Sequence, residues 1–191
     1  MELARGLAGL SGVDEPRFGG KSANLGELLA AGIPVPPGFA LSADAFALFL
    51  EESGLGQRAA QAGAVDGGDL EAVAAMAHSL SQAMHSAHVP DAVREAVARG
   101  YAQLEQACGV HEPPVAVRSS AVGEDSADAS FAGQQETYLW VRGAEHVCDG
   151  VRDCWVSLYS PPAISYRLRL GDPTRSPAMG VTVQLMVDAE V

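Results

Sequence analysis

Two cations close to glycines and hydroxyls are the residues of this chain best suited to binding an anion. Lys21 follows a glycine pair in the sequence GGKS, and Arg118 follows the apolar run at residues 115–117 and precedes two serines. A lysine at a helix N-terminus adds its charge to the positive end of the helix dipole. An arginine at a strand end can present its planar fork to phosphate oxygens. These positions predict a phosphate site.

Each position also has a structural explanation. The GGKS segment lacks the earlier glycine of a full Walker loop, and a glycine turn before a surface lysine is common. Arg118 could instead pair with Glu124 or Asp125 and hold the loop that follows it. Those two carboxylates could also bind a metal, although adjacent carboxylates in a turn are more often solvated. Nearby serines could cap the loop rather than bind a ligand: Ser119, Ser120, Ser126 and Ser130.

Gln184 is a polar residue within the apolar run MGVTVQLMV at residues 179–187. A buried polar side chain requires a hydrogen-bond partner. Gln184 could satisfy the backbone of a neighbouring strand. Alternatively, together with Met186 and Val187, it could form the wall of an adenine pocket, in which backbone groups read the base edge.

Composition narrows the class of partner. The chain has 191 residues, is 48% hydrophobic and carries a formal net charge of −12. This length allows one substantial core or two small subdomains. The acidity argues against nucleic acid or an anionic membrane surface as a partner. No apolar stretch approaches the roughly 18–20 residues that span a bilayer, and the N-terminus lacks a signal region, so we expect neither membrane insertion nor secretion.

The cysteines and histidines form no metal-binding pattern. Cys108, Cys148 and Cys154 are odd in number and lack metal-ligand spacing, which favours buried free thiols in a reducing cytoplasm. Cys148 and Cys154 fall in an expected helix as packing residues. Three histidines lie on or near one expected helix without the i, i+4 pair of a metal site: His78, His85 and His88. We expect no catalytic role for them.

The helices that must position these residues can be read from apolar spacing. A glycine turn opens a helix that Ser22 can cap and Gly32 ends, and Ser42 caps a second helix that runs to about residue 52. Residues 53–68 resemble a loose surface loop. Two amphipathic helices follow, and we expect them to form an antiparallel pair behind the strand at residue 115. Their apolar stripes are Val73, Met76, Leu80 and Met84, then Val93, Val97, Tyr101 and Leu104.

The C-terminal part adds strands and shorter helices. Residues 135–141 resume a strand pattern, residues 144–158 read as a helix, and Pro161 and Pro162 precede a short helix over 163–170. Residues 179–187 predict a buried strand. The fold class is α+β: an N-terminal helical cluster packed on a mixed β-sheet, with a mainly helical part at 1–112 and a strand-rich part at 113–191. A terminal buried strand normally has neighbours on both sides, so we expect the chain to be the front part of something larger.

Several ordered motifs carry a resemblance to a known family. They are GGKSANLGELLAAGIPVPPGFALSADAF, AVRSSAVGEDSADASFAGQQETYLWV, CWVSLYSPPAISYRLRLG and VQLMV. With them, the chain resembles the N-terminal nucleotide-binding region of the phosphoenolpyruvate synthase and pyruvate phosphate dikinase family, to which rifamycin phosphotransferases are related. The resemblance runs from about residue 18 to the end and is weakest over 53–110. Ordered motifs together are far more specific than any one of them.

The resemblance implies an ATP-grasp-like fold in which ATP lies between two lobes. It assigns the phosphates to Lys21 and Arg118, the lining of the nucleotide site to Gly133 and Thr137, and the adenine side to Gln184, Met186 and Val187. In such enzymes ATP phosphorylates a histidine on a swivelling domain, which then phosphorylates pyruvate or another small-molecule acceptor. The Mg²⁺ ligands, a further arginine and that histidine are expected in a second lobe and other domains. None of the five histidines here matches its motif.

Two departures from the family pattern bear on the site. Val122 stands where the common SSATAED motif has a threonine hydroxyl. The segment Ser160-Pro161-Pro162-Ala163 replaces one that usually carries an acidic residue and an arginine, which indicates an altered or degenerate pocket. The resulting prediction is the ATP-binding part of a cytoplasmic phosphoenolpyruvate-synthase-like phosphotransferase with little turnover alone. The alternatives are a rifamycin-type phosphotransferase and a non-catalytic nucleotide-binding or interaction module.

Overall fold

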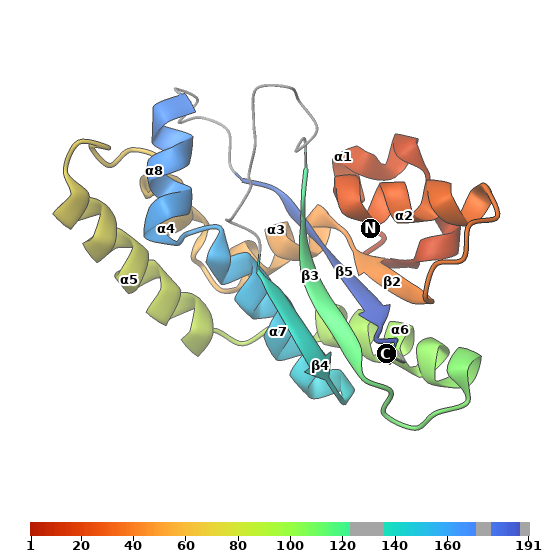
Figure 1. Ribbon diagram of the computed structural model, residues 1–191. Helices are drawn as coiled ribbons and strands as arrows, with labels where there is room; N and C mark the ends of the chain where they lie inside the picture. Colours follow the sequence, from red (N-terminus) through yellow and green to blue (C-terminus); the bar gives the residue numbers. More distant parts are fainter. Residues whose placement is uncertain (123–135, 171–176, 188–191) are drawn as a thin grey trace.

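The computed structural model describes residues 1–122, 136–170 and 177–187. These residues form a five-stranded sheet with helices on both faces (Figure 1). The strands are β1 (Ala4–Gly6), β2 (Gly38–Leu41), β3 (Val115–Ala121), β4 (Thr137–Val141) and β5 (Met179–Leu185). Their order in the sheet is β1-β2-β5-β3-β4, so strands from both ends of the chain share one sheet. The predicted α+β class is confirmed.

The expectation of a mixed sheet is wrong for the described strands. β5 lies between β2 and β3 and is antiparallel to both, and the two edge strands are antiparallel to their neighbours as well. Helical connections let a chain re-enter a sheet from either end, so the spacing of the strands in the sequence does not fix their direction. The predicted buried strand is confirmed, because six of its seven residues are buried.

Three helices cover the apolar face of the sheet, and a further one packs on α7: the three are α3 (Ala43–Glu52), α6 (Asp91–Cys108) and α7 (Ala144–Ser157), and the other is α5 (Leu70–Ser86). Trp155 of α7 is fully buried in their centre. Its ring lies 5.6 Å from that of Phe46 and 5.2 Å from that of Phe49, centroid to centroid. Val117 and Val183 face this core from the two central strands. The predicted apolar stripes are buried here, apart from Met76, which is only partly buried.

Two expectations about the helices are wrong. α5 and α6 do not form an extensive antiparallel pair, because each packs against α7 instead. An amphipathic stripe shows which side of a helix is buried but not which element covers it. Residues 53–68 are not simply a loose loop: they contain α4 (Gly56–Gln61), and Leu55, Ala59 and Ala62 are buried.

The other face of the sheet is covered by α1 (Glu15–Phe18) and α2 (Gly20–Ala30), which follow the 3-10 turns η1 (Leu7–Gly9) and η2 (Gly12–Asp14). Figure 1 shows α1 and α2 on the opposite side of the strands from α5, α7 and α8 (Pro161–Leu170). α8 begins at Pro161 rather than after the prolines, since a first helical turn needs no proline N–H. No helix in the described residues is both long enough and apolar enough to cross a membrane.

Candidate functional site

The glycine turn between α1 and α2 lies directly against the two central strands. Gly19 has a φ of +79°, and a Cβ built on it would collide with the carbonyl oxygen of Ser120 on β3. Gly180 on β5 faces the turn from the other side, where a Cβ would collide with the carbonyl oxygen of Phe18. Only glycine permits such a backbone approach at both places. The start of α2 is therefore fixed against β3 and β5.

Three buried hydroxyls join α2 to the sheet. The hydroxyls of Ser22 and Thr182 share a hydrogen bond of 2.7 Å, and the Ser22 N–H donates to the Ser120 hydroxyl at 3.3 Å. All three residues are completely buried. The N-cap residue of α2 is Gly19, which has no side chain, so Ser120 supplies the oxygen that a capping side chain normally provides. The prediction that Ser22 caps the helix is wrong: Ser22 lies inside α2 and bonds to β5.

This contact brings the two predicted cations to one face of the sheet. Arg118 pairs in register with Thr182 on β5 and with Thr137 on β4. Residues directly opposite one another in a sheet project from the same face. Thr182 in turn bonds to Ser22, whose neighbour in the chain is Lys21. Lys21 and Arg118 are partly exposed and Thr137 is exposed, so solvent reaches this face.

The local electrostatics favour an anion at this face. Lys21 stands in the first turn of α2, and that turn contains no acidic residue. The first turn is where a helix carries its partial positive charge, and a lysine there increases the local positive potential. Arg118, on the same face, increases it further. Two cations and a helix N-terminus together suit a phosphate group.

The predicted adenine-side residues lie near the end of β5 and just beyond it. Gln184 is on the same face as Thr182, and its side-chain amide donates to the carbonyl of Pro36 at 3.2 Å. Its structural role is thus to satisfy the connector before β2 rather than a neighbouring strand. Past the end of β5, the Met186 N–H donates a hydrogen bond to the carbonyl oxygen of Pro114 at 2.9 Å, and Val187 is 61% exposed. At about 3.3 Å per residue, Met186 lies ~13 Å from Thr182 along the chain.

Other expected site residues are either structural or outside the described residues. The Ser119 N–H donates to the Glu136 carbonyl at 3.2 Å, and Ser119 is 1% exposed, so it belongs to the sheet rather than to a ligand site. Sequence reasoning passed over Thr182, although a second polar residue two positions before Gln184 signals a polar face of the strand. The remaining residues lie outside the described part of the chain: Glu124, Asp125, Ser126, Ser130 and Gly133.

Two of the three thiols are buried, as expected. Burial raises the pKa of Cys148 to about 11, and Cys154 is fully buried, so both are packing residues, whereas Cys108 is partly exposed. His85 contacts Asp153 on α7 at 3.1 Å. Within the described residues there is no group of three or more His, Cys, Asp or Glu side chains that could hold a metal ion.

Residues 15–191 match the family described as "Pyruvate phosphate dikinase, AMP/ATP-binding domain". The chain belongs to this family. The match confirms the resemblance read from the sequence motifs.

Curated relatives of this dikinase domain carry a consistent name. The chain is 40% identical over 191 residues to the probable phosphoenolpyruvate synthase of Methanocaldococcus jannaschii, covering 100% of this chain and 16% of the relative. It is 42% identical over 177 residues to the phosphoenolpyruvate synthase of Aeropyrum pernix, covering 91% and 22%. It is 38% identical over 196 residues to that of Deinococcus radiodurans, covering 100% and 24%. The chain therefore spans 16% to 24% of the length of these relatives.

Proposed function

We propose that the face shared by Lys21, Arg118 and Thr137 binds the phosphates of ATP. The adenine would lie toward Gln184, Met186 and Val187, at the other end of β5, and Gly133 would also line the site. One observation carries the proposal: the bond between Ser22 and Thr182 joins the helix of Lys21 to the strand partner of Arg118. Residues far apart in the sequence thereby present two cations on one face.

In the complete protein we propose that this domain supplies ATP for a phosphoenolpyruvate-synthase-type phosphotransferase of the cytoplasm. A histidine on another, swivelling domain would take the phosphoryl group and pass it to pyruvate. The names and greater lengths of the relatives support this, and they favour pyruvate over a rifamycin-type acceptor or a non-catalytic module. We also propose that the second lobe and the swivelling domain belong to the remainder of such a protein.

Within this scheme the residues of the chain position the nucleotide and neutralise its charge. Phosphoryl transfer depends mainly on positioning and on electrostatic stabilisation of the phosphate oxygens. Arg118 can form two parallel hydrogen bonds to a phosphate, whereas Lys21 acts as a point charge at the helix end. Mg²⁺ would accompany ATP, and its ligands would come from the second lobe, since among the described residues no group of three or more His, Cys, Asp or Glu side chains could hold a metal ion.

The proposal is tested by calorimetric titration of ATP and of adenosine against wild type and Arg118→Ala. A hydrogen bond to a charged group contributes about 1.5–3 kcal/mol, so the affinity for ATP should fall about tenfold to a hundredfold. Adenosine, which lacks phosphates, should bind both proteins equally. Arg99→Ala is the matched control, because Arg99 is an exposed arginine of α6. Equal ATP affinity in wild type and Arg118→Ala would contradict the assignment of Arg118.

A further inference from the structure

We propose that the hydroxyls of Ser22, Thr182 and Ser120 act as a positioning device that sets where Lys21 stands relative to Arg118. The inference rests on the proposed ATP site and adds Thr182 and Ser22 to it as residues that act through others. Neither needs to touch the nucleotide, since both are completely buried beneath α2. Their function would be to hold the two phosphate-binding cations at one separation.

The chemistry of this interface is unusual for a buried one. Where α7 meets β3 on the opposite face, the contact is apolar, and Gly150 packs on Val117. Under α2, three hydroxyl residues occupy the contact, although burying a hydroxyl carries a desolvation cost. They compensate one another through the 2.7 Å bond and the 3.3 Å bond to the Ser22 N–H. Apolar contact is non-directional, whereas a hydrogen bond fixes orientation as well as distance.

Each hydroxyl lies close to one of the two cations, either along the chain or across the sheet. Ser22 is the next residue after Lys21 on α2, so a rotation of the helix that breaks the bond to β5 also displaces Lys21. Thr182 lies directly opposite Arg118 in the β3–β5 register. Ser120 lies two residues after Arg118 on β3 and holds the same turn of α2. The bond between Ser22 and Thr182 therefore ties the helix of Lys21 to the strand beside Arg118, and the bond from the Ser22 N–H to Ser120 ties that helix to the strand that carries Arg118.

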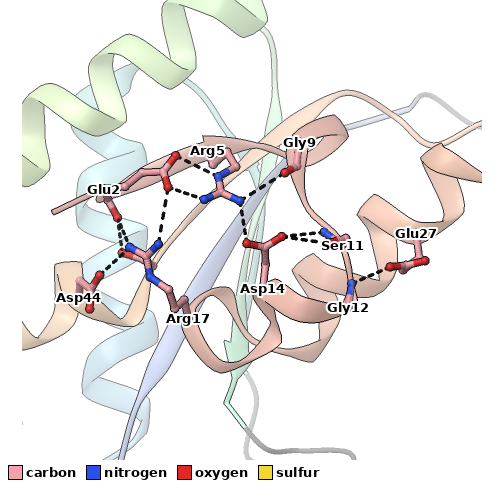
Figure 2. Close-up of polar contacts among 10 residues, drawn as sticks. Glu2, Arg5, Gly9, Ser11, Gly12, Asp14, Arg17, Glu27 and Asp44 are labelled. Atoms are coloured by element: carbon pink, nitrogen blue, oxygen red, sulfur yellow. Dashed lines mark hydrogen bonds and ion pairs between the residues drawn. The ribbon is translucent and has the colours of Figure 1, made fainter.

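A separate set of contacts holds α1, the helix that precedes α2. Loss of one hydroxyl should therefore shift α2 rather than detach it. The guanidinium groups of Arg5 and Arg17 lie 5.1 and 5.5 Å from the ring centre of Phe18, the last residue of α1. Arg17 also pairs with Asp44 of α3 at 2.8 Å and with Glu2 at 3.7 Å. Figure 2 shows these ion pairs joining the start of the chain to α1 and α3.

Thr182→Val tests the proposal, because valine keeps the shape of threonine and removes its hydroxyl. Thr182→Ser is the matched variant that keeps the hydroxyl. We expect ATP affinity to fall about tenfold in Thr182→Val, with adenosine affinity unchanged, and to stay close to wild type in Thr182→Ser. Ser22→Ala removes the other partner of the same bond, so it should reproduce the loss, and the double variant should lose no more than either single one.

Combining Thr182→Val with Arg118→Ala distinguishes a role in placing the cations from a purely structural role of Thr182. If Thr182 acts by placing the cations, removal of Arg118 should reduce the effect of Thr182→Val well below its effect in wild type. The proposal would be overturned if the fold-loss of ATP affinity in the double variant equalled the product of the losses in Thr182→Val and Arg118→Ala. Wild-type ATP affinity in Thr182→Val and Ser22→Ala would overturn it as well.

A ligand-free measurement separates this inference from the proposed function. Amide hydrogen exchange over residues 20–23 should accelerate in Thr182→Val and Ser22→Ala but not in Thr182→Ser, because a shift of α2 would weaken the bond from the N–H of residue 22 to the Ser120 hydroxyl. If wild type binds no ATP, the proposed function fails, while exchange still decides whether the hydroxyls position α2. Unchanged exchange in both variants would overturn the positioning device itself.

Discussion

The two faces of the central sheet are held by different forces. On one face, Val117 and Val183 pack against a core centred on Trp155, and the contact is apolar and extensive. On the other, α1 and α2 enclose a smaller apolar cluster around Phe18, and close glycine contacts, buried hydroxyls and ion pairs add to it. Burial of apolar area gives stability without fixing direction, and directional polar contacts fix geometry with less net stability. The apolar face should therefore dominate unfolding, and the polar face should dominate placement of the site.

The largest expected effect is a loss of stability from a substitution in the apolar core. Trp155→Ala removes a completely buried indole between Phe46 and Phe49, and we expect it to lower the free energy of unfolding by about 3–5 kcal/mol. Urea denaturation measures this loss. Trp155→Phe is the matched control and should lose much less, since among the described residues the indole N–H has no hydrogen-bond partner to give up. A loss below about 1 kcal/mol in Trp155→Ala would show that this core is not the main source of stability.

Substituting one glycine on each face compares the two faces more directly, and the larger of the two stability effects should be intermediate in size. In Gly180→Ala the new methyl group meets the Phe18 carbonyl, so α1 must move away from β5, and we expect a loss of about 1–3 kcal/mol. In Gly150→Ala the methyl group lies 3.4 Å from the side chain of Val117, which is an ordinary van der Waals contact, and alanine is the better helix former. We expect that variant to stay within about 1 kcal/mol of wild type.

The same two glycine variants separate stability from site geometry. Gly180→Ala should weaken ATP binding as well, because the displaced turn carries Lys21, whereas Gly150→Ala should bind ATP as wild type does. Thermal unfolding and calorimetry on both proteins provide the two readings. Equal effects of the two substitutions on ATP binding would remove the distinction between the faces.

The sequence predicted best what depends on local periodicity. The stripe of α6 and the buried run of β5 were assigned correctly, because apolar spacing reports which side of an element is buried. Arg118 and Lys21 were recognised as candidates from their residue types and from their places after an apolar run and after a glycine pair. What the sequence did not reveal is non-local. Ser22 and Thr182 bond across 160 positions, and β5 enters between β2 and β3 with no local signal for that place. The partner of an amphipathic helix is similarly undetermined, as α5 and α6 show.

The smallest expected effect concerns the ion pairs that fasten the polar face, and it should depend on pH. Asp14 contacts Arg5 at 2.7 Å and accepts hydrogen bonds from the Ser11 N–H and hydroxyl. Burial acts to raise the pKa of Asp14, but the hydrogen bonds from Ser11 and Arg5 outweigh it, so the pKa lies below its usual value. A lowered carboxyl pKa means that its stabilisation is complete above the unfolded-state value and is lost as pH falls through the folded-state value.

Asp14→Asn should accordingly be less stable than wild type at neutral pH, by about 1 kcal/mol or less, as expected for an ion pair near the surface that keeps some contact with solvent. The stability difference between the two proteins should shrink as pH falls below about 3.9, because aspartate in the unfolded chain becomes protonated there, before Asp14 of the folded protein does. Urea denaturation of both proteins at a series of pH values measures it. Glu95→Gln, which breaks the exposed pair with Arg99, is the control and should show almost no difference. A difference that widens on acidification would have the wrong sign and would mean that the polar face is not held by the charged form of Asp14.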